Sequence, residues 1–93
     1  IYVSKEKLSK AKEELQLVVD NSKMPPLKQI AKIRIARIMA SDKSYADALN
    51  ELSKVDDNAY LPVINELKGD IYSATGKYQD AISSYRLAIE EVK

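Results

Sequence analysis

The feature that most constrains the fold is an internal repeat. When IARIMASDKSYADALNELSKV is aligned with KGDIYSATGKYQDAISSYRLA, Tyr45 falls on Tyr78, a shift of 33 residues (78 − 45). The same shift places Ala36 on Gly69. Periods of this size are typical of solenoids in which each repeat is a helix, a turn and a second helix. The sequence therefore predicts stacked helix pairs.

Helical periodicity supports this prediction in five segments. They are expected at residues 5–20, 27–40, 45–55, 62–74 and 78–92, where apolar residues recur at three- and four-residue spacing. No segment alternates with the period of two that is typical of a strand. Pro25 and Pro26 are expected to stop the first helix because neither has an amide hydrogen, and Gly76 is expected to close the fourth with a positive φ. We predict an all-α array of about five antiparallel helices.

The repeat also predicts the domain organisation. Residues 1–93 form one helical-repeat domain fragment, with a half repeat at 1–22 and full repeats at 27–56 and 60–93. The first residue is Ile1 rather than Met, so we expect a piece excised from a longer chain. The first helix corresponds to the second half of an earlier repeat and lacks a partner on one side. Because uncapped solenoid ends associate or fray, residues 1–20 are predicted to form a homodimer or to fray.

Gly69 is unusual because it interrupts a helical segment, where a glycine costs about 1 kcal/mol relative to alanine. The repeat offers an explanation, since two helices that pack closely need small residues where they approach. Gly69 and Ala36 occupy the first helix of each pair, and Ala81 and Ala48 occupy the second. We interpret Gly69 as a packing residue and not as part of a ligand site.

Composition argues against catalysis and against several kinds of partner. The chain has no cysteine and no histidine, which removes disulfides, thiolate nucleophiles, imidazole bases and the usual zinc ligands. Its 15 basic and 14 acidic residues give a net charge of +1, without the basic excess typical of nucleic-acid binding. The stretch KGDIYSATGK lacks the spacing of a phosphate-binding loop. We predict no enzyme activity, no cofactor and no metal.

The last repeat resembles the tetratricopeptide repeat. A small residue, an aromatic, a turn glycine, an alanine and a late aromatic stand where that repeat has them: Gly69, Tyr72, Gly76, Tyr78, Ala81, Tyr85 and Ala88. The middle repeat fits more loosely, with Ala36, Tyr45, Ala48 and Leu52, but Lys43 stands at the position of the turn glycine. Both repeats depart from the usual pattern early in their first helix, where a large aromatic and a leucine are common.

From residue 27 to about residue 90 the chain is similar to the family of the bacterial ancillary SecYEG translocon subunit. The similarity is carried by Leu27, Lys28, Arg34, Ala36, Arg37, Ala48, Leu49, Leu67, Lys68, Gly69, Asp70, Gly76, Lys77 and Ala81. It implies a bacterial inner-membrane protein with one N-terminal transmembrane helix and a repeat domain in the periplasm. The implied partners are the SecYEG translocon, periplasmic chaperones and newly exported client polypeptides.

The first helices of stacked pairs commonly line a concave surface that receives a partner. The residues expected on this surface are Ile30, Ile33, Arg37, Val63, Glu66 and Asp70. The alternative is that Ile30, Ile33 and Val63 are buried against neighbouring helices.

The sequence thus predicts a non-catalytic protein–protein interaction module, with no nucleic-acid partner and no membrane contact by these residues themselves. We expect it to serve chaperoning or trafficking of exported proteins on the periplasmic side of the inner membrane. Two alternatives remain at this point: a cytoplasmic tetratricopeptide-repeat adaptor that scaffolds a soluble complex, and an accessory domain of a larger enzyme.

Overall fold

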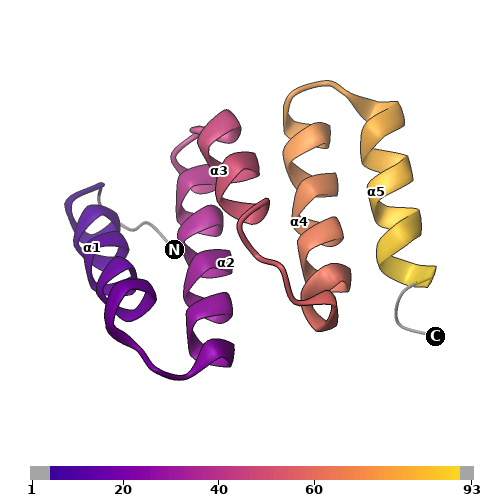
Figure 1. Ribbon diagram of the computed structural model, residues 1–93. Helices are drawn as coiled ribbons and strands as arrows, with labels where there is room; N and C mark the ends of the chain where they lie inside the picture. Colours follow the sequence, from indigo (N-terminus) through magenta and orange to yellow (C-terminus); the bar gives the residue numbers. More distant parts are fainter. Residues whose placement is uncertain (1–4, 91–93) are drawn as a thin grey trace. The chain divides into compact units, whose positions relative to one another are not determined.

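The prediction of an all-α array is confirmed by a computed structural model, which describes residues 5–90 (Figure 1). This part of the chain contains five α-helices, one short 3₁₀ helix and no strand. The elements are α1 (Lys5–Asn21), α2 (Pro25–Ser41), α3 (Tyr45–Leu52), η1 (Asn58–Tyr60), α4 (Leu61–Ala74) and α5 (Tyr78–Glu90). The chain divides into two compact units, one ending at Asp56 and the other beginning at Asp57.

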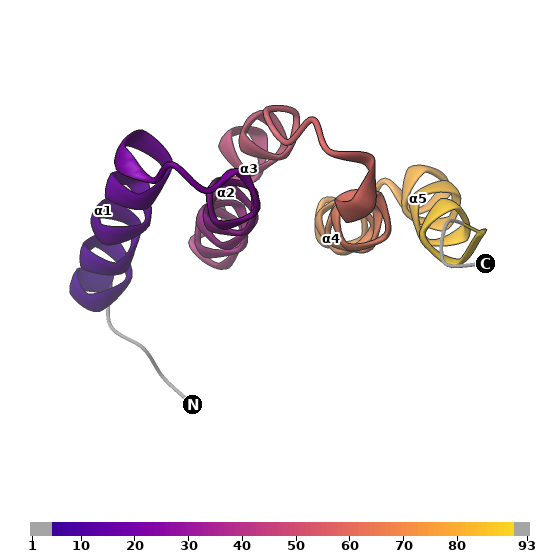
Figure 2. The ribbon, with the colours of Figure 1, turned by 60° about the horizontal axis from the view of Figure 1, so that its bottom comes forward.

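The first unit contains α1, α2 and α3. Helix α2 runs antiparallel to both of its neighbours and packs against each of them (Figures 1 and 2). Because α2 is covered on two sides, its apolar residues occupy a wide arc of the helix, as burial of an amphipathic surface requires. The buried apolar residues of this unit are Ala31, Ile33, Ile35, Ala36, Ala48, Leu52 and Val55.

The second unit contains η1 and the antiparallel pair α4 and α5, which lie side by side (Figures 1 and 2). Its buried apolar residues are Ile64, Leu67, Ile71 and Ala81. Gly69 is buried as well. The side chain of Asp57 accepts a hydrogen bond from the Ala59 amide (2.9 Å) and thereby begins η1, which leads directly into α4.

Pro25 and Pro26 have a second role that the sequence prediction missed. Helix α1 ends at Asn21, and Met24 is extended (φ −104°, ψ 105°). The two prolines then form the first turn of α2 rather than merely ending α1. A first turn suits proline because its amides have no carbonyl partner within the helix and its fixed φ is already helical.

The turns after α2 and α4 have the same geometry, although only one contains a glycine. Gly76 has φ +78°, and Lys43, at the equivalent repeat position, has φ +64°. The Ser44 amide donates to the Met39 carbonyl (2.8 Å), and the Lys77 amide donates to the Tyr72 carbonyl (2.8 Å). These bonds define a Schellman motif at the end of each helix. The left-handed residue is therefore a feature of the repeat, and lysine fills it in the first unit.

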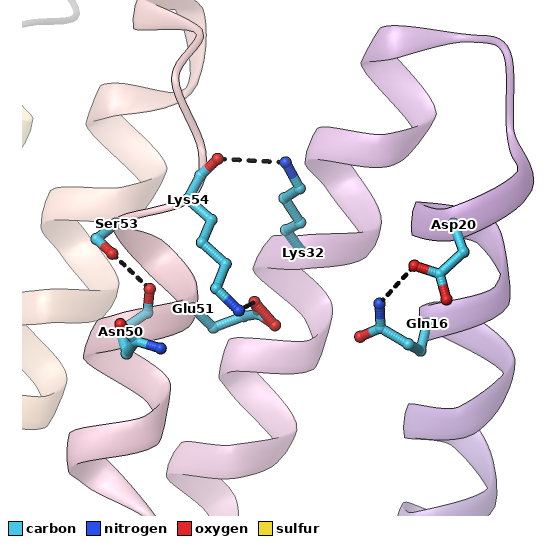
Figure 3. Close-up of polar contacts among 7 residues, drawn as sticks. All are labelled: Gln16, Asp20, Lys32, Asn50, Glu51, Ser53 and Lys54. Carbon is cyan, nitrogen blue, oxygen red and sulfur yellow. Dashed lines mark hydrogen bonds and ion pairs between the residues drawn. The ribbon is translucent and has the colours of Figure 1, made fainter.

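Polar contacts connect α2 to the end of α3. The Lys32 ammonium donates to the Lys54 carbonyl (3.2 Å), and Lys54 forms an ion pair with the buried Glu51 (3.4 Å) (Figure 3). Gln29 Nε2 donates to Asp56 Oδ1 (2.9 Å) on the same side of α2.

Helix α3 ends at Leu52 instead of the expected residue 55. Residues 53–55 turn back onto the helix through bonds such as Val55 N–H to Leu52 O (3.1 Å).

Candidate protein-binding surface

Helix α2 carries an exposed stripe on one side. Its members are spaced by three, four and three residues, so they share one face of the helix: Leu27, Ile30, Arg34 and Arg37. Leu27 and Ile30 are among the exposed large apolar residues of the chain. The stripe is therefore apolar toward the start of α2 and basic toward its end.

The basic end of this stripe borders an open groove between α1 and α2 with a volume of about 550 Å³. We call it the α1–α2 groove. It is lined by Ala11, Glu14, Leu15 and Val18 from α1 and by Arg34, Arg37 and Ile38 from α2. Four of these seven residues are apolar, which gives the groove an apolar floor with a charged residue on α1 and two on α2.

The charged side chains of the groove have no polar partner within the described part of the chain. Among residues 5–90, the side chains of Arg34, Arg37 and Glu14 make no hydrogen bond and no ion pair. Arg34 and Arg37 are three residues apart, so their side chains leave adjacent positions on the helix surface. Two guanidinium groups thus lie together at the edge of an apolar groove with their donors available.

The structure places Ile30 and Arg37 on the exposed stripe, but it corrects the prediction for Ile33. Ile33 is only 6% exposed and so cannot contribute to a surface. The reason is its position between Gln29 and Ala36, which are also buried and share its side of α2. Gln29, on this same side of α2, also bonds to Asp56 just after α3. Of the three apolar residues in the alternative interpretation, Ile33 alone is buried.

In the second unit, Val63 is half-buried and Glu66 and Asp70 are exposed on α4. Asp70 is not a free carboxylate, because its Oδ1 accepts a hydrogen bond from the Tyr85 hydroxyl. This bond, with burial and the negative charges of Asp70 and Glu66, raises the pKa of Tyr85 to about 12. Asp70 therefore has an internal structural role in addition to its exposure.

Tyr85 also explains why position 69 is a glycine. A Cβ built on Gly69 would lie 2.5–2.7 Å from three ring carbons of Tyr85, closer than real Cβ atoms approach other atoms. The aromatic ring of α5 thus lies directly over the backbone of α4 at Gly69, and the Asp70 bond holds its hydroxyl. The close contact seen at Gly69 is therefore between the Tyr85 ring and the helix backbone.

The other residues of the repeat motif take different positions. Ala36, Ala48 and Ala81 are buried, whereas Tyr72 and Ala88 are half-buried. Gly76 lies exposed in its turn. Tyr78, the first residue of α5, is 65% exposed.

Sequence reasoning missed most of the groove. Of its lining residues, only Arg37 was expected on a binding surface, and Arg34 was noted only for its family resemblance. A usable signal was present, because Arg34 stands three residues before Arg37 and seven after Leu27 on one helical face. The groove itself needs the position of α1 against α2, which no spacing along the sequence provides.

Within residues 5–90, no group of three or more histidine, cysteine, aspartate or glutamate side chains is arranged to hold a metal ion. None of the helices in this part of the chain has both the length and the apolar character needed to cross a membrane.

Antiparallel helix pairs, recurring with matching turns, define this chain as a helical-repeat protein. Over residues 1–93 it matches the tetratricopeptide repeat-like domain family, and it belongs to that family.

The chain is also similar to curated proteins that share one name, ancillary SecYEG translocon subunit. The protein from Neisseria gonorrhoeae is 30% identical over 82 residues, which are 88% of this chain and 39% of the relative. The protein from Buchnera aphidicola subsp. Schizaphis graminum is 29% identical over 85 residues, 91% of this chain and 44% of the relative. The chain therefore spans less than half the length of these relatives. No solved structure matches it at a significant level.

Proposed function

We propose that the chain is a non-catalytic protein–protein interaction module, the repeat domain of a translocon-associated inner-membrane protein. The observation that carries this proposal is the open α1–α2 groove in a tetratricopeptide repeat-like domain, since open apolar grooves on helical repeats are suited to receive polypeptide partners. The relatives named ancillary SecYEG translocon subunit support the choice of partner. The partners would be SecYEG, periplasmic chaperones or exported client polypeptides.

Site-specific photo-crosslinking in the intact parent protein tests this function. A photoreactive residue at Val18 would lie in the groove, and the same residue at Ala46, exposed on α3, serves as the matched control. We expect crosslinks to translocon subunits or exported proteins from position 18 and not from position 46. Equal crosslinking from both positions, or crosslinks to unrelated proteins alone, would contradict the proposal.

The proposed location is the periplasmic side of the inner membrane. Protease added to spheroplasts that carry the intact parent protein should digest this domain from outside, and extraction of the parent should require detergent. A soluble parent that is protected from protease would overturn the periplasmic location and favour a cytoplasmic adaptor.

We further propose that the domain self-associates through α1. Leu17 is 60% exposed on α1 and lies outside the lining of the α1–α2 groove, so its side chain is available to contact a second copy.

A further inference from the structure

We infer that the α1–α2 groove selects acidic amphipathic polypeptide segments, with apolar side chains in the groove and carboxylates on Arg34 and Arg37. This inference rests on the proposed function, because it specifies the chemistry of the partner that the same groove receives.

The apolar part of the selection follows from the lining. Ala11, Leu15 and Val18 contribute one wall and Ile38 contributes to the other. The volume of about 550 Å³ is within the usual range of ligand pockets, roughly 300–1,000 Å³. Covering this surface with apolar side chains would remove it from water, which is the main favourable contribution to most protein associations. A fully polar segment would gain none of that free energy.

The acidic part of the selection follows from the two arginines. Arg34 and Arg37 are adjacent on one helical face, exposed, and without any partner among residues 5–90. A guanidinium group presents paired donors that match the two oxygens of a carboxylate. On the α1 side, Glu14 would repel a carboxylate. The charges therefore also orient the ligand, with its acidic flank along α2.

Charge and shape favour a polypeptide over a lipid surface. Membrane-binding patches usually combine about four to eight lysines and arginines, whereas this groove has two arginines and one glutamate. A concave apolar surface also suits a protruding side chain better than a bilayer, which is bound by convex or flat amphipathic faces.

The test uses two matched amphipathic peptides as probes. Both carry leucines at positions i, i+4 and i+7, and they differ only in having glutamates or lysines on the flanks. Fluorescence anisotropy with the full chain should show that the glutamate peptide binds about tenfold or more tightly than the lysine peptide at low salt, with the difference falling as salt is added.

Charge reversal provides the decisive variant. Arg34→Glu with Arg37→Glu should reverse the preference between the two peptides. The control, Lys77→Glu with Arg86→Glu, changes the net charge equally at exposed positions outside the groove and should leave the preference intact.

A second pair of variants tests the apolar wall of the groove. Val18→Glu should abolish binding, while Leu17→Glu, beside it on α1 but outside the lining, should not. Circular dichroism of each variant checks that the helices remain folded.

Equal binding of both peptides, or a preference that survives the Arg34 and Arg37 reversal, would overturn the inference. So would binding to phosphatidylglycerol vesicles without binding to either peptide. Failure of the proposed function is a separate result: peptide selectivity without crosslinks from position 18 would reject the partner assignment alone. Crosslinks that persist in the doubly reversed variant would reject the charge selection alone.

Discussion

Gly69, Asp70 and Tyr85 form one cooperative contact between α4 and α5, in which a ring lies over a glycine and its hydroxyl bonds to the next residue. Gly69→Ala should gain about 1 kcal/mol from helix propensity. It should lose more, because overpacking costs roughly 1–3 kcal/mol and the displaced ring also loses its bond to Asp70. We expect a net loss of about 1 kcal/mol in the free energy of unfolding, measured by urea denaturation.

Whether Gly69→Ala raises or lowers the free energy of unfolding depends on the Tyr85 ring, so a variant without this ring is the control. In a Tyr85→Ala background, the ring atoms that the new Cβ would meet are absent. Gly69→Ala should then stabilise the protein by about 1 kcal/mol through helix propensity. If the alanine substitution destabilises both backgrounds equally, the ring contact is not the reason for the glycine.

Tyr85 also predicts a pH dependence. Its pKa is raised from 10.0 to about 12 in the folded state, chiefly by the hydrogen bond to Asp70. Below pH 10 the phenol is protonated in both the folded and unfolded states, so its contribution to stability is fully present. Between pH 10 and about 12 the unfolded state loses the proton first, and stability should fall.

The measurement is a titration of phenolate absorbance together with unfolding at several alkaline pH values. Tyr85→Phe should remove the phenol that ionises near pH 12 and reduce the loss of stability over this range. Asp70→Asn should lower the pKa of Tyr85, because the negative charge near the phenol is removed. A titration in which no phenolate absorbance develops near pH 12, or in which that absorbance persists in the Tyr85→Phe variant, would contradict the assignment.

At the scale of elements, the turn after α2 carries a strain that the turn after α4 avoids. Lys43 has φ +64°, a conformation that costs a non-glycine residue roughly 1–2 kcal/mol. Lys43→Gly should therefore stabilise the protein, by up to about 1 kcal/mol after the entropy of the unfolded glycine is included. The reciprocal change, Gly76→Ala, should destabilise it by a similar amount. Thermal unfolding of both variants checks the pair, and opposite signs are required.

The elements were predictable from the sequence to the extent that local chemistry determines them. The periodicity located all five helices, and the repeat placed the left-handed turn residue at Gly76. Proline at the start of α2 was misread because the same missing amide that stops one helix is tolerated in the first turn of the next. The end of α3 was misplaced because residues 53–55 form a turn whose bonds locally resemble those of the helix.

At the scale of the whole molecule, the candidate surface was predictable only in part. Ile30 and Arg37 follow from helical spacing, but the exposure of Ile30 and the burial of Ile33 depend on how neighbouring segments pack around α2. The groove requires α1 and α2 to pack side by side and leave space between them, which is a property of tertiary structure. The sequence therefore indicated the helix that carries the surface, and the structure determined which of its residues are available.

The self-association proposed for α1 is a property of the whole molecule and can be measured directly. If the side of α1 that carries Leu17 contacts a second copy, static light scattering should show a mass that rises with concentration, and Leu17→Glu should keep the protein monomeric. Ile89→Glu is the matched control, because Ile89 is exposed on α5 to a similar degree, 65% against 60%. Association abolished by the Ile89 change instead would move the interface to α5. A monomer at every concentration, with amide protection throughout α1, would show that α2 alone is sufficient to hold this helix.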